Sequence, residues 1–276
     1  MEGGAMRGLF TAGVTDVLME NHIEVDGAIG VSAGAAFGCN FISRQPRRVL
    51  RYNLRFCKDP RFCSWWSLLT TGNMYNVEFG YYVIPTTMVK FDYEAFAANP
   101  TEFWSVATDV MTGQPVYHKY LKLEEEDTRW MIASASIPLF AKPVHVGGRT
   151  LLDGGLSDSI PLKFMEEHGY EKNIVILTQP KVYKKRDLSY MPILRLGLRE
   201  YPNLVHAIDV RPDMYNDQVR YVNRRAKEGA AFVIQPPARL NIGAICHDRS
   251  EIRRVYRLGR EAALRRLDEL KAWMKK

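Results

Sequence analysis

The stretch AIGVSAGAAFG, residues 28–38, constrains the fold of this 276-residue chain most strongly. Ser32 lies there between Gly30 and Gly34, after the apolar segment 25–31 and before small residues that predict the start of a helix. A serine on so tight a strand-to-helix turn has strained backbone geometry, and side chains in place of either glycine would collide. The turn lifts the hydroxyl clear of the sheet and aims the first N–H groups of the helix at it. We therefore predict a nucleophile elbow at Ser32.

A serine hydroxyl is a poor nucleophile until a base takes its proton. In an α/β-hydrolase this base is a histidine that follows the serine and an acid along the chain. Only His206 and His247 stand late enough, and neither lies in a loop with an evident acid partner. The serine also comes much earlier than in that fold, where several strands precede it. A Ser-His-Asp esterase with one of these histidines is therefore kept as an alternative hypothesis.

The chain opens with EGGAMRG, in which Gly3, Gly4 and Gly8 surround Arg7, and a helical pattern of apolar residues follows. A glycine-rich loop that opens a helix points N–H groups outward and can bind an anion, including the oxyanion of a transition state. Its spacing is neither the G-x-G-x-x-G of a dinucleotide site nor a phosphate-binding loop that ends in G-K-[ST]. A simple glycine turn is the alternative.

A second glycine turn follows a predicted short strand at residues 150–152, where Asp153 precedes Gly154 and Gly155. A carboxylate fixed at the end of a strand can reach a facing catalytic group. The same three residues also fit an ordinary turn, in which the aspartate side chain bonds to the backbone.

Together, GGAMRG at 3–8, GVSAG at 30–34 and DGG at 153–155 resemble the ordered motifs of the patatin-like phospholipase family. Segments 105–118 and 131–162 are also similar to the family's central hairpin and to the approach to its aspartate. The resemblance covers residues 1–180. The family has an apolar strand ahead of the glycine loop, whereas this sequence reaches the loop at once, so we expect a weakened sheet there.

This resemblance implies a serine acyl hydrolase with a Ser-Asp dyad, in which Asp153 is the base for Ser32. It implies an oxyanion hole built from the N–H groups of Gly3, Gly4 and Ala5. The supporting motif residues that it carries over are Arg7, Gly8, Gly30, Gly34, Gly154 and Gly155. The implied substrate is a phospholipid or another acyl ester, and no metal or organic cofactor is implied. A catalytically silent lipid- or protein-binding module with the same fold is the alternative from another functional class.

Further strands are predicted at 173–178 and 230–235, with one or two helices around Pro212 between them. Alternating strands and helices predict a three-layer α/β/α fold around a central, mostly parallel sheet. No linker-like composition divides the chain, so we expect a single domain over 1–276, with the motifs in 1–180 and a strand and helices in 181–276.

A net charge of +7 and four dispersed cysteines bear on the compartment and the binding partners of the protein. No apolar run reaches the roughly 18 residues of a membrane span, and the start is not that of a signal peptide. We expect a cytoplasmic protein with reduced thiols and no zinc site, and one that does not bind nucleic acid, because no basic and aromatic recognition motif occurs. The basic segment 253–276 predicts a surface helix packed on the core, with peripheral attraction to an anionic membrane as the alternative.

Two further segments allow two interpretations each. Residues 56–84 are rich in large apolar side chains, which predict either a helical subdomain or the wall and cap of an acyl pocket in contact with lipid. The segment KVYKKR, residues 181–186, predicts a solvated surface loop, with contact to a phosphate as the alternative.

Overall fold

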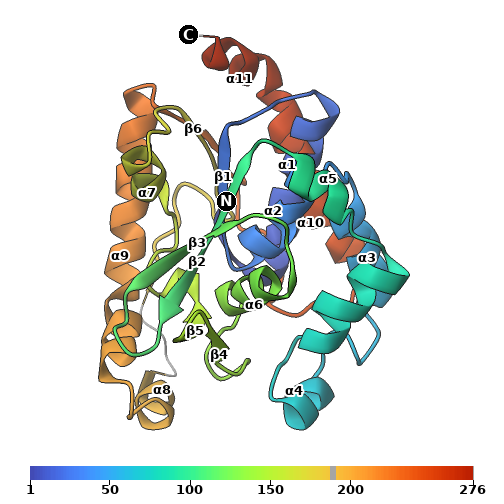
Figure 1. Ribbon diagram of the computed structural model, residues 1–276. Coiled ribbons are helices and arrows are strands. Elements are labelled where there is room, and N and C mark those ends of the chain that lie inside the picture. Colours follow the sequence, from blue (N-terminus) through green and yellow to red (C-terminus); the bar gives the residue numbers. More distant parts are fainter. Residues whose placement is uncertain (187–190, 276) are drawn as a thin grey trace.

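The computed structural model describes residues 1–186 and 191–275, which form a mixed α/β fold (Figure 1). The strands are β1 (Gly27–Val31), β2 (Glu102–Asp109), β3 (Pro115–Tyr120), β4 (Val144–Val146), β5 (Arg149–Asp153), β6 (Asn173–Ile176) and β7 (Ala231–Ile234). The α-helices are α1 (Gly8–Glu20), α2 (Ala33–Ile42), α3 (Arg48–Phe56), α4 (Trp65–Thr71), α5 (Tyr93–Ala98), α6 (Glu125–Ser134), α7 (Leu162–Glu167), α8 (Met191–Gly197), α9 (Pro202–Lys227), α10 (Arg249–Arg265) and α11 (Leu267–Met274). The other helical segments are the 3-10 turns η1 (Ala5–Arg7) and η3 (Gly154–Leu156) and the π-helical η2 (Glu78–Met88).

The central strands run parallel, because β1 pairs with β2 and β6 pairs with β7 in parallel registers. Strands β3, β5 and β4 extend the sheet beyond β2 with antiparallel pairings. Met1 lies between the two parallel pairs: its nitrogen donates to the Ile29 carbonyl, and its carbonyl accepts from Val31. The next residue, Glu2, donates its N–H to the carbonyl of Ile176 in β6. The first two residues therefore connect β1 to β6 where the sequence predicts a weakened sheet.

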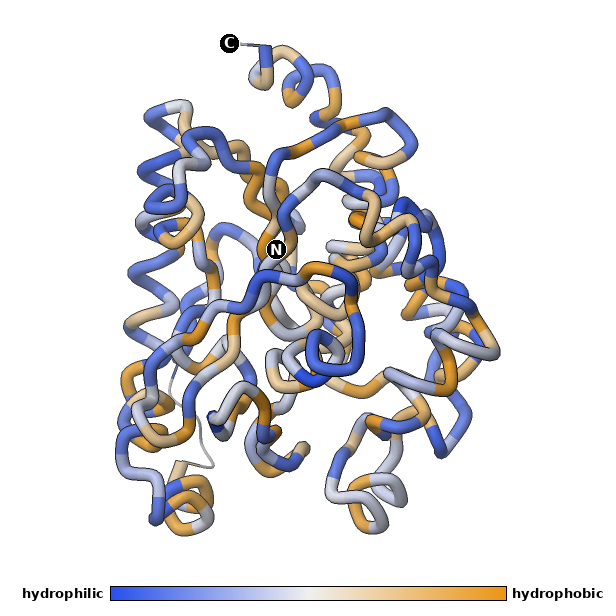
Figure 2. Tube along the Cα trace, viewed as in Figure 1, coloured by the Kyte–Doolittle hydropathy of each residue, from blue (hydrophilic) through white to orange (hydrophobic). Residues whose placement is uncertain are grey.

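Successive residues of a strand point to opposite faces of the sheet, and this alternation builds two apolar layers. In β5 and β6, Leu151 and Ile176 pack into the core shared with α1, α2 and α10, whereas Leu152 and Val175 contact the side formed by α7, α8 and α9. Figure 1 shows α7 and α9 on one side of the sheet and α1, α2 and α10 on the other. Figure 2 shows orange, hydrophobic residues along the interior strands and much of α9 in blue. The predicted three-layer α/β/α fold is confirmed.

The local predictions around the sheet are confirmed with one refinement. β1 ends at Val31 and α2 begins at Ala33, so Ser32 stands between strand and helix as predicted. Helix α9 continues through Pro212, where the sequence left a break open. Ile208 and Tyr215 on the same helix are buried, and their burial offsets the cost of about 3 kcal/mol that an interior proline imposes on a helix.

The basic C-terminal segment forms two helices that meet at Arg266. Tyr256, Ala263 and Leu270 are buried, so the segment packs on the core, as one of its two interpretations predicts. Several of its arginines pair with carboxylates, namely Arg254 with Glu251, Arg257 with Glu261, Arg260 with Glu20 and Arg266 with Glu269. None of the helices in the described ranges is long and apolar enough to cross a membrane.

Candidate active site

Ser32 occupies the sharp turn between β1 and α2. Its φ is 55° and its ψ is −123°, a conformation that costs a non-glycine residue of order 1–3 kcal/mol. A Cβ added at Gly30 would lie 2.3 Å from the carbonyl oxygen of Gly34, and one added at Gly34 would lie 2.4 Å from that of Met1. Because both obstacles are backbone atoms, the turn requires glycine at both positions. The N–H of Ser32 donates to Oγ of the buried Ser134 at the end of α6, at 3.1 Å, and this bond fixes the turn.

The glycine loop at the start of the chain lies directly against Ser32. A Cβ added at Gly3 would be 2.9 Å from Cβ of Ser32. Gly4 and Ala5 have φ values of 151° and 49°, so the backbone turns sharply before η1. In the described part of the chain no carbonyl accepts the N–H groups of Gly3 and Gly4, and Ala5 begins η1, where N–H groups lack intrahelical partners. These three residues line a cavity at Ser32, so their N–H groups could receive an oxyanion.

Asp153 lies at the end of β5, where its N–H donates to the Ser136 carbonyl at 2.8 Å. Its Oδ1 accepts the Gly155 N–H at 2.8 Å, the side-chain-to-backbone turn contact that one interpretation of the sequence predicts. The carboxylate and Ser32 line the same cavity, where the serine hydroxyl is close enough to lower the pKa of the carboxylate. Burial raises the pKa of Asp153, and the Ser32 contact and the Arg211 charge only partly oppose this rise. The carboxylate is therefore a stronger base than an exposed aspartate.

The supporting glycines permit close approach of the elements around this pair. A Cβ added at Gly8 would meet Cβ of Ala33 at 2.9 Å, so α1 starts close against α2. A Cβ added at Gly154 would lie 2.1 Å from the carbonyl oxygen of Val106, so the aspartate turn presses on β2. Arg7 extends from η1 along the cavity that Ser32 and Asp153 share.

Ser32 lies where two cavities meet. The first, called the apolar cavity, has a volume of about 280 Å³. Its wall includes Phe37, Tyr52, Met74, Tyr81, Ile84, Met131, Phe140 and Ile245. The second, called the polar cavity, has a volume of about 270 Å³. The glycine loop and Asp153 line it, together with Arg7, Gln179, Tyr183, Lys185 and Arg211.

Residues 56–84 form a small packed subdomain and also contribute to the wall of the apolar cavity. Met74 and Tyr81 line the apolar cavity, and Phe79 packs in a small core of its own segment. Trp65 and Trp66 on α4 instead point to solvent, with 65% and 68% of their surface exposed. This segment therefore builds one wall of the cavity and also presents an apolar surface outside it.

The histidines lie away from Ser32. His206 is exposed on α9, and Nδ1 of His247 bonds the carbonyl of Cys57. Across the described ranges, no histidine lines either the apolar or the polar cavity. In residues 1–186 and 191–275 no group of three or more His, Cys, Asp or Glu side chains is arranged to hold a metal ion.

Comparison with known proteins agrees with this geometry. Residues 1–165, more than half of the chain, match the family model of the patatin-like phospholipases. The chain belongs to this family. Membership of the patatin-like phospholipase family implies lipid hydrolase activity. Residues 201–275 match a second model, the domain of unknown function DUF6363.

Several proteins are similar in sequence to this chain over different parts of their length. It is 27% identical to the uncharacterized protein YjjU of Escherichia coli over 94% of its own length and 73% of that protein. It is 28% identical to the uncharacterized NTE family protein Mb2594 of Mycobacterium bovis, over 60% of the chain and 27% of that protein. It is 23% identical to lysophospholipase NTE1 of Debaryomyces hansenii, over 85% of the chain and 16% of that protein.

Two residues at the site, Ser134 and Arg211, escaped the sequence analysis, and a third, Lys185, lies in a segment for which phosphate contact was only the alternative. Ser134 precedes the aspartate motif by almost twenty residues, and nothing in its neighbours signals a bond to Ser32. Lys185 belongs to the segment interpreted as a solvated loop, yet it is half-buried and lines the polar cavity. Arg211 lies in α9, outside the matched patatin region, and its Nε donates to the Gly155 carbonyl at 2.5 Å. Helical periodicity alone gives no sign that Arg211 lines the same cavity as Ser32.

Proposed function

We propose that the protein is a serine acyl hydrolase of the phospholipase A or lysophospholipase type, with Ser32 as nucleophile and Asp153 as its base. One observation carries the proposal: a serine on a strained turn meets a buried carboxylate where an apolar and a polar cavity join. The apolar cavity would hold the acyl chain, and the polar cavity would hold the alcohol that leaves.

In the first half of the reaction, Oγ of Ser32 forms a bond to the ester carbonyl carbon while its proton passes to Asp153. The N–H groups of Gly3, Gly4 and Ala5 donate to the oxyanion, and each such donor contributes about 3 kcal/mol in the transition state. Collapse of this intermediate breaks the bond to the alcohol oxygen, which takes the proton back from Asp153. A water molecule then repeats the sequence on the acyl-serine and releases the fatty acid.

We also propose that the protein meets a lipid bilayer through an apolar rim around the mouth of the apolar cavity. The rim comprises the exposed residues Trp65, Trp66, Leu69, Leu139, Phe140, Ile193 and Leu196. It is continuous, because the rings of Trp65 and Phe140 lie 6.5 Å apart and Leu139 lies against Gly197 of α8. Helices α4 and α8 both lie toward the lower end of the molecule in Figure 1, and Figure 2 colours parts of both helices orange.

Charge and position favour a bilayer as the occupant of the apolar rim. Segments 65–71, 137–142 and 191–199 carry Lys142, Arg195 and Arg199 and no carboxylate of their own. Arg195 pairs with Asp209 of α9, so Lys142 and Arg199 are the charges that suit an anionic surface. Tryptophan is favoured at membrane–water interfaces. Phe140 also lines the apolar cavity, so a lipid that leaves the bilayer at the rim would enter beside Ser32. The basic C-terminal helix suits this role less well, because its arginines are largely paired.

A fluorophosphonate probe, which bonds covalently to activated serines, tests the proposed dyad. We expect the wild-type protein to be labelled, Ser32→Ala to lose labelling, and Asp153→Asn to lose most of it. His206→Ala and His247→Ala serve as matched controls for the histidine-based alternative and are expected to label normally. If folded wild-type protein resists the probe, the dyad proposal is wrong and a lipid-binding module is favoured. If labelling instead depends on one of the histidines, the Ser-His-Asp alternative is favoured.

A further inference from the structure

The polar cavity beside Ser32 contains three cationic side chains from distant parts of the chain. Arg7 comes from η1, Lys185 from the loop after β6, and Arg211 from α9. In the described ranges, none of the three forms an ion pair with a carboxylate, although fifteen such pairs occur elsewhere in the molecule. Partly buried cations without an anion are costly, so their convergence on one cavity calls for a ligand of opposite charge.

The contacts of these three side chains leave some of their hydrogen-bond donors without an acceptor among the described residues. Nε of Arg7 is fully buried and has no hydrogen-bond acceptor among the described residues. Arg211 uses its Nε on the Gly155 carbonyl, which leaves its terminal nitrogens without a described acceptor. The ammonium group of Lys185 lies 4.7 Å from the centre of the Tyr215 ring, a cation–π contact that places it over the base of the cavity.

The two carboxylates of the same cavity are already engaged. Glu2 accepts hydrogen bonds from the Thr178 N–H and the Tyr215 hydroxyl, and Asp153 accepts from the Gly155 N–H beside Ser32. Burial and the charge of Arg211 lower the pKa of Lys185 to about 7. The three cations that line the cavity outnumber its two carboxylates, so an anion bound there would be stabilised.

We infer that Lys185 and Arg211, assisted by Arg7, bind a phosphate group carried by the alcohol that leaves during hydrolysis. This inference rests on the proposed function. With the acyl chain in the apolar cavity and the ester carbon at Ser32, the alcohol must extend into the polar cavity. An alcohol that carries a phosphate there meets guanidinium donors suited to bidentate contact with phosphate oxygens. Lys185 and Arg211 would therefore make the site favour an acyl ester of a phosphorylated glycerol over a neutral glyceride.

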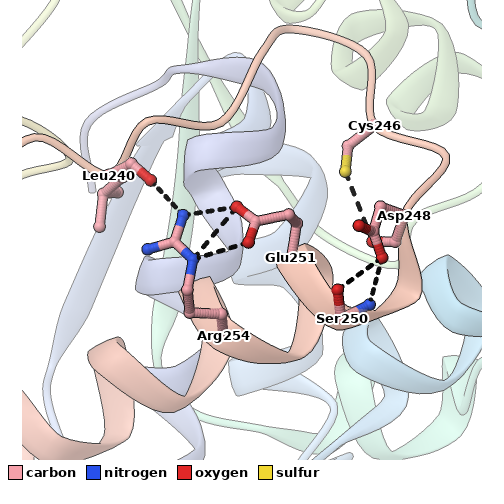
Figure 3. A network of polar contacts seen from close by, with 6 residues as sticks. All are labelled: Leu240, Cys246, Asp248, Ser250, Glu251 and Arg254. Carbon is pink, nitrogen blue, oxygen red and sulfur yellow. Dashed lines mark hydrogen bonds and ion pairs between the residues drawn. The ribbon is translucent and has the colours of Figure 1, made fainter.

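The same geometry gives a role to residues 201–275, which match the domain of unknown function. Arg211 belongs to this region, and so does Ala244, which lines both cavities. Figure 3 shows how the loop that carries Ala244 is held: Arg254 binds Glu251 and donates to the Leu240 carbonyl at one end. At the other end, Asp248 accepts from Ser250. The C-terminal region thus completes the substrate site of the patatin region, and its contribution is selection of the leaving group.

The test compares two single-chain substrates with the same oleoyl chain, lysophosphatidate and monooleoylglycerol, in the same detergent micelles. The readout is the ratio of their kcat/KM values. We expect wild type to favour lysophosphatidate and Lys185→Met to lower the ratio about 10- to 100-fold, the loss that follows from one charge-assisted hydrogen bond. Lys185→Arg should restore most of the preference. Lys184→Met removes an exposed neighbouring charge and serves as the matched control. An unchanged ratio in Lys185→Met overturns the inference.

Binding to Ser32→Ala protein, measured by calorimetry, separates this inference from the proposed function. If neither substrate is turned over by wild type, the proposed function fails. Weaker binding of lysophosphatidate to the variant that also carries Lys185→Met would still support the phosphate site, and equal binding would overturn it. Inorganic phosphate distinguishes a free ion from a substrate group. If it binds in a Lys185-dependent way while the kcat/KM ratio is independent of Lys185, the cavity holds free phosphate and the inference is wrong.

Discussion

Ser134→Ala should disturb the turn at Ser32, the proposed nucleophile, without changing Ser32 itself. Oγ of Ser134 accepts the N–H of Ser32 at 3.1 Å from the end of α6. Ser134 has no exposed surface, so water cannot replace the lost acceptor. The substitution leaves a buried N–H unsatisfied at a residue whose φ of 55° already stores strain.

The magnitude follows from these contacts. An unsatisfied buried donor costs about 1–3 kcal/mol of unfolding free energy. For a chain of 276 residues this corresponds to a loss of about 2–5 °C in unfolding temperature. The effect on turnover should be larger, because relaxation of the turn moves Oγ of Ser32 away from Asp153. A misplacement of this kind lowers kcat about 10- to 100-fold.

Calorimetry and ester hydrolysis, measured on the same preparations, check both numbers. Ser105→Ala is the matched control, because Ser105 is equally buried in the neighbouring strand β2 and its hydroxyl pairs with that of Tyr120 at 2.7 Å instead of with the backbone of Ser32. We expect the control to lose comparable stability and to keep its kcat. If Ser134→Ala lowers kcat no more than Ser105→Ala does, the bond to Ser32 does not position the nucleophile, and the reasoning is refuted.

Two further predictions concern the base and the membrane. Burial raises the pKa of Asp153 in the folded state, so ionisation of Asp153 destabilises the fold. The full stability is retained below the ordinary aspartate pKa, and part of it is lost as the pH rises through the raised pKa. Asp153→Asn should therefore raise the unfolding temperature at pH 7, although it abolishes turnover. The acid limb of wild-type kcat/KM should lie above pH 3.8, where an ordinary aspartate titrates. An acid limb at or below pH 3.8 would contradict this. Replacing Trp65 and Trp66 by serine should weaken binding to phosphatidylglycerol vesicles at least about 10-fold in sedimentation assays. Leu264→Ser, at an exposed apolar position of α10, is the control, and an equal loss there would count against the apolar rim.

Local sequence determined the parts of this protein that depend on sterics within a few residues. Gly30 and Gly34 leave room for backbone atoms that no side chain could share, so the turn at Ser32 is encoded by its immediate neighbours. Short apolar segments likewise predicted β1, β6 and β7, and the alternation of strands with helices predicted the layered fold. The three ordered motifs were sufficient to indicate the family.

Only the tertiary structure decided what surrounds Ser32. Asp153 reaches it because β5 and β1 both border β2, a pairing that depends on the whole sheet. Lys185 and Arg211 converge on the same cavity because α9 crosses the sheet and the loop after β6 folds beside it. The sequence left contact with a phosphate open for segment 181–186, but nothing near Lys185 or Arg211 predicts that these two side chains meet. Local sterics act over a few residues and can be read from them, whereas a cavity is the joint product of segments whose packing no single stretch encodes.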